Sequence, residues 1–446
     1  MIMSFYDELA RWPHETLDAL IASSTADDVL RALAATRPGP ADLAALLSPA
    51  AMPYLEDMAQ RAHELTVRHF GRTIQLFTPL YLANHCTNQC RYCGFNARNH
   101  IRRDQLDAER IMAEGRAIAS TGLRQLLLLT GDAPRISTVS YIAEAAHRLR
   151  PLFPSIGVEV YAMQVEEYAE LVAGGVESLT MFQETYNPGL YAWLHPAGPK
   201  RDFRFRLDAP ERGCLGGMRS VGLGALLGLD DWRRDAFYTA MHGAWLQRYY
   251  PATEVSFSVP RMRPHTGSFE PQHPVSDREL VQILTAYRIF MPTAGITVSS
   301  REAAAFRDNL IPLGVTRMSA GVSTAVGGHA AGGDGNVAST EGAAAAIAAS
   351  TAISSGDATG DLSGRSTKVD MTSGMAHAVT EDLQQGADAG PSQFDISDDR
   401  SVEEMVSAIT ARGYQPVFKD WEPPQDNVYA CGAAGHADGT VRCEAR

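Results

Sequence analysis

Apolar residues in the first part of the chain recur at the spacing of amphipathic helices. The segments ADDVLRALAA, ADLAALLS and YLEDMAQRAHELTVRHF each place apolar side chains three or four residues apart. No motif with a recognisable chemical role stands among them. We therefore predict that residues 1–72 form an N-terminal helical cap.

From residue 73 onward, short β-prone apolar runs alternate with helical patterns. Two clear helical patterns are DAERIMAEGRAIAS (107–120) and VEEYAELVA (165–173), and we expect Gly122 and Gly174 to close these helices. This alternation is typical of parallel β/α units, and eight is the number of strands that closes a TIM-like (β/α)8 barrel. The sequence thus predicts an α/β fold with such a barrel over residues 73–330. The eight runs are IQLFTPLYL (74–82), QLLLLT (125–130), IGVEVYA (156–162), ESLTMF (177–182), SVGLGAL (220–226), EVSFSV (254–259), GITVSS (295–300) and VTRMSA (315–320).

The segment 331–391 has a different composition. Between Gly332 and Pro391 there is no aromatic residue, and eight acidic residues stand against two basic ones. Such a segment cannot bury enough apolar surface to offset the entropy lost on ordering, so we predict a disordered, low-complexity insertion. An alternative is that EGAAAAIAAS forms one loose helix, because alanine favours that conformation.

Residues 392–422 regain the pattern of an ordered region. Ser401 and Glu404 form a capping box before an apolar helical repeat, and Gly413 ends that repeat. We expect this C-terminal helical region to pack on the barrel. Residues 423–446 are rich in turn formers and are expected to form a frayed tail.

The overall charge narrows the classes of partner. The 446 residues carry a formal net charge of -13, of which the insertion supplies about half. Nucleic-acid binding requires clustered Lys and Arg, so we expect no nucleic-acid partner. The chain shows no apolar run of about 18 residues and no secretory signal, so we expect a cytoplasmic protein with no membrane partner.

The most specific chemical signal is the segment HCTNQCRYCGFN, which follows the first predicted strand. Its cysteines, Cys86, Cys90 and Cys93, have C-x3-C-x2-C spacing. A tight group of three in a chain of this kind indicates a metal site rather than disulfides. A ferredoxin site supplies four cysteines. Three cysteines would leave one iron of a [4Fe-4S] cluster without a protein ligand, open to the amino and carboxylate groups of S-adenosylmethionine. One electron from the cluster can then break the S–C5′ bond of that molecule.

A zinc site completed by His85 or His100 is the alternative reading of the triplet. Zinc sites usually consist of two pairs of ligands, and no second pair stands nearby. We therefore favour the cluster and interpret the two histidines as loop or packing residues. Cys214 is interpreted as a packed thiol, whereas Cys431 and Cys443 receive no role.

The motif C-x3-C-x-Y-C-G-F resembles the radical S-adenosylmethionine (radical SAM) superfamily. Within it, the chain is similar to the family of 2-iminoacetate synthases, the ThiH tyrosine lyases of thiamine biosynthesis. The resemblance covers nearly the whole chain except the insertion and the last residues. It is carried by PLYLANHCTNQCRYCGFNARNHIRR (79–103), LLLLTGDAP (126–134), FQETYNPGLYAWLHPAGPKRDFRFRLDAPERG (182–213), VGLGALLGL (221–229), SFSVPRMRPHTG (256–267), SSREAAAFRDNLIPLGVTRMSAG (299–321) and QFDISDDRSVEEM through GYQPVFKDWE (393–422).

The resemblance implies which residues hold the cofactors. The family typically has T-G-E after the second strand, where its backbone and acid meet the methionyl amino group. Here Asp132 replaces that glutamate and is one methylene shorter, so a direct contact by its side chain stays open. The implied set comprises the cluster ligands Cys86, Cys90 and Cys93 and the SAM-binding residues Tyr92, Phe95, Thr130, Gly131 and Asp132.

The resemblance also implies a substrate site. Tyr81 matches a substrate-contacting tyrosine of related aromatic amino-acid lyases, and Arg301 matches the arginine that holds the substrate carboxylate. Ser319 falls in the loop after the eighth run, where close relatives often have a second serine in place of Val322. Each of these residues lies in or after a predicted strand, and barrel active sites gather at the carboxyl ends of strands.

Two other arginines compete for the carboxylate role. An arginine can bind a carboxylate with two N–H groups at once. Arg261 and Arg263 stand after the sixth predicted strand in the same way as Arg301 stands after the seventh. The alternative for each arginine is a salt bridge at the barrel rim. Gln183 and Glu184 either line the pocket or pair with such arginines.

The implied activity is a radical SAM lyase reaction on L-tyrosine. Loss of a hydrogen at the amino nitrogen would be followed by Cα–Cβ cleavage to 2-iminoacetate (dehydroglycine) and p-cresol. Implied partners are thiazole synthase (ThiG) and a flavodoxin or ferredoxin electron donor. The alternatives are a tryptophan lyase, a non-catalytic iron–sulfur carrier or scaffold, and the tyrosine lyase HydG of [FeFe]-hydrogenase maturation. HydG is disfavoured because Cys431 and Cys443 do not form a C-x2-C pair.

Overall fold

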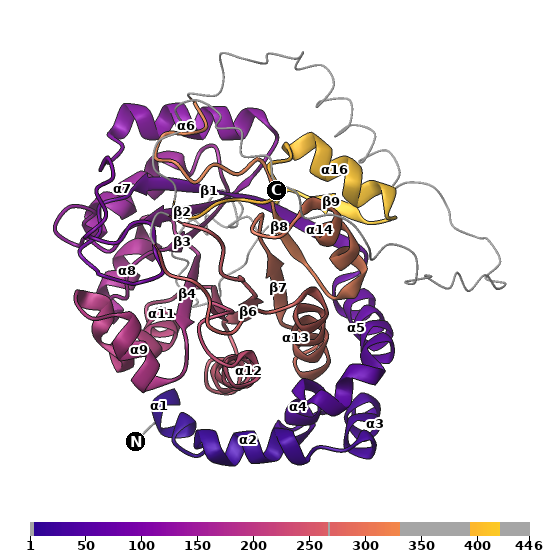
Figure 1. The fold of residues 1–446 in the computed structure, drawn as a ribbon. Coiled ribbons are helices and arrows are strands. Elements are labelled where there is room, and N and C mark those ends of the chain that lie inside the picture. The colour runs from indigo at the N-terminus through magenta and orange to yellow at the C-terminus, as the bar shows by residue number, and fades with distance from the viewer. Residues whose placement is uncertain (1–3, 266–267, 331–392, 420–446) are drawn as a thin grey trace, which may run out of the picture.

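The structure is a computed structural model in which helices enclose a barrel of parallel strands (Figure 1). The described residues are 4–265, 268–330 and 393–419. The predicted insertion and tail, together with Cys431 and Cys443, lie outside the described residues.

All eight predicted strands are present, and they pair in parallel in chain order. The first strand pairs with both the second and the eighth, which closes the sheet. The predicted (β/α)8 barrel is therefore confirmed. The strands are β1 (Thr73–Ala83), β2 (Gln125–Thr130), β3 (Ser155–Glu159), β4 (Ser178–Glu184), β5 (Ser220–Ala225), β6 (Glu254–Ser258), β7 (Gly295–Val298) and β8 (Arg317–Ser319).

Helices follow the strands on the outside of the barrel (Figure 1). They are α6 (Ala108–Ser120), α7 (Val139–Leu149), α8 (Val165–Ala173), α9 (Pro188–Leu194), α10 (Phe203–Leu207), α11 (Ala209–Leu215), α12 (Trp232–Tyr249), α13 (Asp277–Phe290) and α14 (Ala304–Leu310), with short 3-10 turns at Pro199–Arg201 and Ile311–Leu313. The predicted end of α6 at Gly122 is observed, with a φ of 90°. At α8 the positive φ falls on Gly175 rather than on Gly174. Gly174 is nevertheless the residue that caps α8, as predicted, and it also allows close packing, because a Cβ there would lie 2.8 Å from the carbonyl oxygen of Ala143 in α7.

The N-terminal helices pack against the outside of α12 and α13 (Figure 1). They are α1 (Phe5–Leu9), α2 (His14–Ser23), α3 (Ala26–Ala34), α4 (Pro40–Leu47) and α5 (Leu55–Phe70), with a 3-10 turn at Pro49–Tyr54. Gln282 of α13 donates to the carbonyls of Leu46 and Ser48 at 2.8 Å each. Carbonyls at a helix end lack partners within the helix, so this buried amide satisfies the end of α4 and fixes it to the barrel.

The interior of the barrel is lined by small and polar side chains. TIM-like barrels usually fill this space with layers of branched apolar residues. Here Gly157, Thr180, Ser256, Ser258 and Thr297 line a cavity instead. The barrel therefore retains open space inside the ring of strands.

The C-terminal region adds a ninth strand that the sequence did not predict. Strand β9 (Gln415–Val417) pairs in parallel with the start of β1, with Thr73 opposite Gln415. It follows α16 (Val402–Ala411), whose predicted capping box of Ser401 and Glu404 is present. A three-residue strand carries too little periodicity to be recognised alone, so pairing with β1 defines it.

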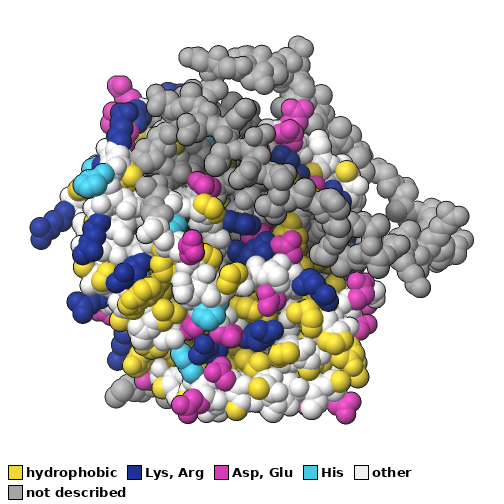
Figure 2. Space-filling model, in the orientation of Figure 1, with side chains coloured by type: hydrophobic (Ala, Val, Ile, Leu, Met, Phe, Trp, Pro, Cys, Tyr) yellow, Lys and Arg dark blue, Asp and Glu magenta, His cyan; other side chains and the backbone are white. Residues whose placement is uncertain are grey.

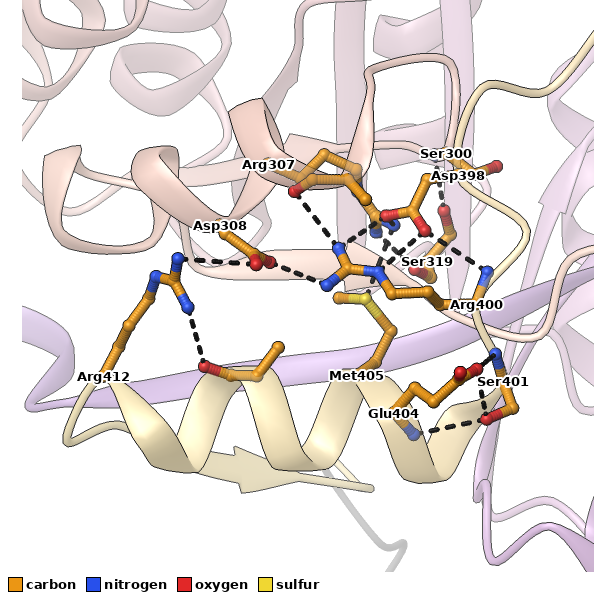
Figure 3. Close-up of polar contacts among 12 residues, drawn as sticks. Ser300, Arg307, Asp308, Ser319, Asp398, Arg400, Ser401, Glu404, Met405 and Arg412 are labelled. Atoms are coloured by element: carbon orange, nitrogen blue, oxygen red, sulfur yellow. Dashed lines mark hydrogen bonds and ion pairs between the residues drawn. The ribbon is translucent and has the colours of Figure 1, made fainter. Parts of the chain in front are cut away.

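A buried ionic network anchors the segment before α16 (Figure 3). The Asp398 carboxylate accepts hydrogen bonds from Arg307 and Arg400, and Arg307 also donates to the Ser319 carbonyl. The backbone N–H of Asp398 donates to the Ser300 carbonyl at 3.1 Å. Burial alone would raise the pKa of Asp398, but Arg400 and Arg307 lower it below its ordinary value. The network thus ties the segment to the loops after β7 and β8.

Acidic and basic side chains are interspersed over the described part of the face shown in Figure 2.

None of the helices in the described ranges is long and apolar enough to cross a lipid bilayer.

We predict that Asp398→Ala destabilises the protein strongly. The substitution leaves the buried Arg307 charge without its partner, and breaking such a pair costs about 3–5 kcal/mol. Urea unfolding followed by circular dichroism should show a lower midpoint. The exposed Glu403→Ala serves as the control, with a change within about 0.5 kcal/mol. Equal midpoints for both variants would contradict the anchoring role.

Candidate active site

A cavity inside the barrel contains the three residues that the sequence assigned to the substrate. Tyr81 lines it from β1, Arg301 from the loop after β7, and Ser319 from the end of β8. Val322 also lines it, and Phe394 of the C-terminal segment closes part of its wall. Residues far apart in the sequence therefore meet in one cavity.

The three cysteines lie in the loop between β1 and α6, beside this cavity. The loop is held to the end of β2 by Asp132, whose carbonyl accepts from the N–H and hydroxyl of Thr87 at 2.9 and 2.8 Å. The Asp132 carboxylate accepts from the Asn88 amide at 2.7 Å. Asp132 thus positions the cysteine loop with both its backbone and its side chain.

Arg103 closes the other side of the cysteine loop. Its guanidinium donates to the carbonyls of Asn84, Phe95 and Asn96 at 2.7, 3.0 and 2.7 Å. Fixed donors of this kind satisfy loop carbonyls that have no partner in a helix or strand. The sequence contained Arg103 within the matched segment but did not reveal this role.

Gly131 allows the cysteine loop to rest directly on β2. A Cβ at this position would lie 2.3 Å from the His85 carbonyl oxygen and 3.1 Å from the Cys86 Cβ. The preceding hydroxyl, that of Thr130, is buried and has no hydrogen-bond partner among the described residues. A buried polar atom without a partner is costly, so this position fits a bound ligand.

The thiols lie in apolar surroundings. Tyr81, Phe95 and Leu129 form a buried cluster that contacts Cys86 and Cys93, whereas a second apolar cluster contains Cys90. Burial raises the pKa of Cys86 to about 12 and raises the pKa values of Cys90 and Cys93 as well. Thiols in such surroundings ionise when they coordinate a metal.

The arrangement of the thiols is compatible with a cluster. Among the described residues, no three or more His, Cys, Asp or Glu side chains converge on one point as ligands of a single ion would, and neither His85 nor His100 forms such a group with the cysteines. In a cubane cluster each thiolate binds a different iron, so its ligands need not converge on one point.

Tyr92 is held by a histidine. Its hydroxyl lies 2.7 Å from His195 Nε2, and His195 Nδ1 lies 2.8 Å from the Tyr191 carbonyl oxygen. A carbonyl can only accept, so Nδ1 carries the proton and Nε2 accepts from Tyr92. Burial lowers the pKa of His195 to about 3, which keeps the ring neutral as this bond requires.

Tyr81 connects the cavity to the C-terminal segment. Its hydroxyl donates to Gln393 Oε1 at 2.8 Å, and its ring meets Phe95 edge-on with 5.9 Å between centroids. Gln393 Nε2 lies 4.0 Å from Cys93 Sγ. Gln393 stood within the matched segment, but nothing local indicated that it reaches the cysteine loop.

The three competing arginines have different surroundings. Arg261 and Arg263 both pair with Glu302, as the rim alternative anticipated. Arg301 forms no ion pair with any described carboxylate, and its guanidinium lies 3.4 Å from the centroid of the Phe394 ring. Arg301 is therefore the arginine whose charge is available to a ligand in the cavity.

Glu184 forms its own ionic group near Tyr92. It pairs with Lys200 at 2.5 Å and Arg206 at 3.6 Å, rather than with the three arginines above. Its φ of 71° places a non-glycine residue in the left-handed region, next to an irregularity in the pairing of β4 with β5. Such strain persists where surrounding contacts enforce it, often at functional sites. Gln183 leaves its buried Oε1 without a described partner.

The hydroxyl of Ser319 is held by backbone. Its Oγ accepts from the Ser300 N–H at 2.9 Å, which aligns the ends of β7 and β8 at the cavity. The hydroxyl hydrogen is left to donate elsewhere.

Sequence reasoning missed Glu159 as a cavity residue. It is the last residue of β3 and lines the cavity. Burial raises the pKa of this carboxyl to about 7. The available signal was a single charge inside the apolar run IGVEVYA, at a position where inward-facing residues are expected.

Comparisons with known proteins find relatives that match most of this chain. Residues 80–239 match the radical SAM superfamily, and residues 258–415 match the Biotin and Thiamin Synthesis associated domain. The chain is 37% identical to the 2-iminoacetate synthase of Escherichia coli K12 and 36% identical to that of Salmonella typhimurium. Each alignment spans 420 residues, 94% of this chain and 97% of the relative.

A solved structure supports the fold. The crystal structure of HydG, a maturase of the [FeFe]-hydrogenase, superimposes with a TM-score of 0.74 at 24% identity. The match covers 93% of this chain and 80% of that chain. At this identity the likeness bears on the fold alone.

We predict that Gly131→Ala impairs assembly of the cysteine loop. The added Cβ would meet the His85 carbonyl, and forcing an extra methyl group into such a contact costs about 1–3 kcal/mol. Iron and sulfide analysis after anaerobic reconstitution should show less cluster per chain. Gly189→Ala is the control, because its Cβ would meet Asn187 at an ordinary 3.5 Å. Full cluster content in Gly131→Ala would refute the packing role.

Proposed function

The chain belongs to the 2-iminoacetate synthase family of the radical SAM superfamily, and we propose that it cleaves the Cα–Cβ bond of L-tyrosine to 2-iminoacetate and p-cresol. The observation that carries this proposal is the position of Arg301. An arginine without an ion-pair partner faces the cavity that also contains Tyr81, whose ring contacts the same apolar cluster as Cys86 and Cys93. A substrate carboxylate would thus be bound beside the cysteine loop.

Cys86, Cys90 and Cys93 are the residues that would hold a [4Fe-4S] cluster. When bound, the cluster would supply the electron that cleaves S-adenosylmethionine to methionine and a 5′-deoxyadenosyl radical. The hydroxyl of Thr130 and the backbone of Gly131 are proposed to receive the methionyl group. The remaining proposed SAM contacts are Tyr92 and Phe95.

Asp132 is proposed to act mainly through the cysteine loop. Its carboxylate is already engaged by the Asn88 amide, and its carbonyl binds Thr87. This arrangement supports a positioning role for its side chain rather than a direct contact with the cofactor.

The substrate residues have complementary proposed tasks. Arg301 binds the tyrosine carboxylate with two parallel N–H donors, for which its planar head is suited. The Ser319 hydroxyl is proposed to donate to the substrate, because its oxygen is oriented by the Ser300 N–H and its hydrogen has no acceptor among the described residues. Tyr81 limits the cavity on the side of the cysteine loop and is held there by Gln393.

The C-terminal segment would protect the reaction from water. Phe394 stacks on Arg301, and the Asp398 network fixes the segment that carries it. A closed, dry cavity strengthens electrostatic contacts and prevents side reactions of a radical. The segment thereby contributes to the site without contacting a reacting atom.

Two further partners are proposed, one to receive the product and one to supply the electron. 2-Iminoacetate hydrolyses readily in water, so transfer to a thiazole synthase (ThiG) is proposed. A flavodoxin or ferredoxin is proposed as the electron donor.

The cysteine content disfavours the HydG alternative, because Cys431 and Cys443 are too far apart in sequence for a C-x2-C pair.

The central test is an anaerobic incubation of the reconstituted protein with S-adenosylmethionine, a reductant and L-tyrosine. We expect 5′-deoxyadenosine and p-cresol, measured by liquid chromatography. Absence of 5′-deoxyadenosine would exclude the radical mechanism, whereas 5′-deoxyadenosine without p-cresol would exclude tyrosine as the substrate. Cys90→Ala is expected to lose the cluster and both products.

We predict that Arg301→Lys lowers kcat/KM for tyrosine by about 10- to 100-fold, because a bidentate contact becomes a single one. Most of the change should lie in KM, and cluster content should be unchanged. Arg263→Lys is the matched control, because this arginine pairs with Glu302 rather than with a ligand. Equal effects of the two substitutions would argue against the assignment of Arg301.

A further inference from the structure

Glu159 is placed opposite the proposed carboxylate anchor. It ends β3, and Arg301 follows β7, so the two come from strands on opposite sides of an eight-stranded barrel (Figure 1). The pairing register aligns Tyr81, Leu129 and Glu159 on β1, β2 and β3. Glu159 therefore belongs to the same row of paired residues as Tyr81 and Leu129.

The charge of Glu159 has no protein partner in the described ranges. No ion pair or hydrogen bond of its carboxylate is present among them, although Arg301 acts on its pKa electrostatically. It is the one carboxylate among the residues that line the cavity. Arg317 lines the cavity too, but it starts β8 opposite Gln75 and lies deeper in the barrel.

A cavity with one carboxylate and one available guanidinium is complementary to a zwitterion. A charge withdrawn from bulk water is costly unless it is paired, so each of these partly buried groups fits a ligand of opposite charge. An amino acid carries both, as an α-carboxylate and an α-ammonium group. If Arg301 takes the carboxylate, the group left for the ammonium is Glu159.

Resting on the proposed function, we propose that Glu159 binds the α-amino group of tyrosine and removes one proton from it. An N–H bond of the ammonium group breaks, an O–H bond forms on the Glu159 carboxylate, and the electron pair stays on nitrogen. No electron is transferred in this step. The substrate then enters the hydrogen-abstraction step as a neutral amine, with its nitrogen positioned between Glu159 and the cysteine loop.

The charged groups around Glu159 are compatible with this role. Burial raises the pKa of Glu159 and Arg301 from the β7 loop lowers it, while Tyr81 faces the carboxyl from β1. The group of Glu184, Lys200 and Arg206 also acts on it but is paired internally. The balance leaves a pKa of about 7, so the carboxyl can accept and release a proton at neutral pH.

The test compares reconstituted wild type and Glu159→Gln across a range of pH. Loss of a general base typically lowers a rate by about 10²- to 10⁴-fold, so p-cresol formation by the variant should fall by that factor near neutral pH. Glutamine cannot accept the proton, so the variant depends on tyrosine that is already neutral at its amine. That fraction rises about tenfold per pH unit below the amine pKa. The variant should therefore approach the wild-type rate as the pH rises.

Further variants separate this role from a structural one. Glu159→Asp keeps a carboxylate and should restore part of the activity at neutral pH. Glu177→Gln is the matched control, because Glu177 is a buried glutamate that binds Ser155 and Arg219 just before the start of β4. This variant should leave p-cresol formation unchanged. Cluster content should be equal in all variants.

Three outcomes would overturn the proposal. A near-wild-type rate of p-cresol formation by Glu159→Gln at neutral pH would exclude Glu159 as a base. A loss of rate that is the same at every pH would also exclude it, because such a loss indicates a structural role or a contact with the phenol. Wild-type protein that forms no p-cresol would refute the proposed function and this inference together. Wild-type activity combined with either of the first two outcomes refutes the role of Glu159 alone.

Discussion

Closure of β8 onto β1 is the constraint on which the rest of the structure depends. A closed parallel barrel brings the carboxyl ends of all strands to one rim, so residues from distant parts of the chain share one space. The usual layers of branched side chains are replaced by glycine, serine and threonine in much of the interior. Closure thus creates a rim for the cysteine loop and a cavity beneath it.

The second constraint is that charge in this dry interior must be paired. Glu302 holds Arg261 and Arg263, Glu184 holds Lys200 and Arg206, and Asp398 holds Arg307 and Arg400. Among the residues that line the cavity, Arg301 and Glu159 are opposite charges without an ion-pair partner in the described part of the chain. Their position on opposite walls of the cavity is the physical basis for assigning a zwitterionic substrate.

The C-terminal segment connects stability with the site. The Asp398 network holds it between the loops after β7 and β8, and strand β9 attaches it to the start of β1. From this anchor Gln393 reaches Tyr81 and Phe394 covers Arg301. The same segment that completes the fold therefore completes the wall of the cavity.

The sequence by itself determined the barrel and the family, because alternating strand and helix patterns and the cysteine spacing are local properties. It also predicted substrate roles for Tyr81, Arg301 and Ser319 through the resemblance, and the structure places all three in one cavity. It could not choose among the arginines by pattern alone, since their difference lies in whether Glu302 is near.

Only the tertiary structure brought Glu159, Gln393 and Phe394 to the site. Gln393 and Phe394 are ordinary residues in their local context, and Glu159 stood out only as a single charge inside an apolar run. The strand β9 is too short to show a period. The physical reason is that burial, pairing and register depend on contacts between distant segments, whereas a sequence pattern records only near neighbours along the chain.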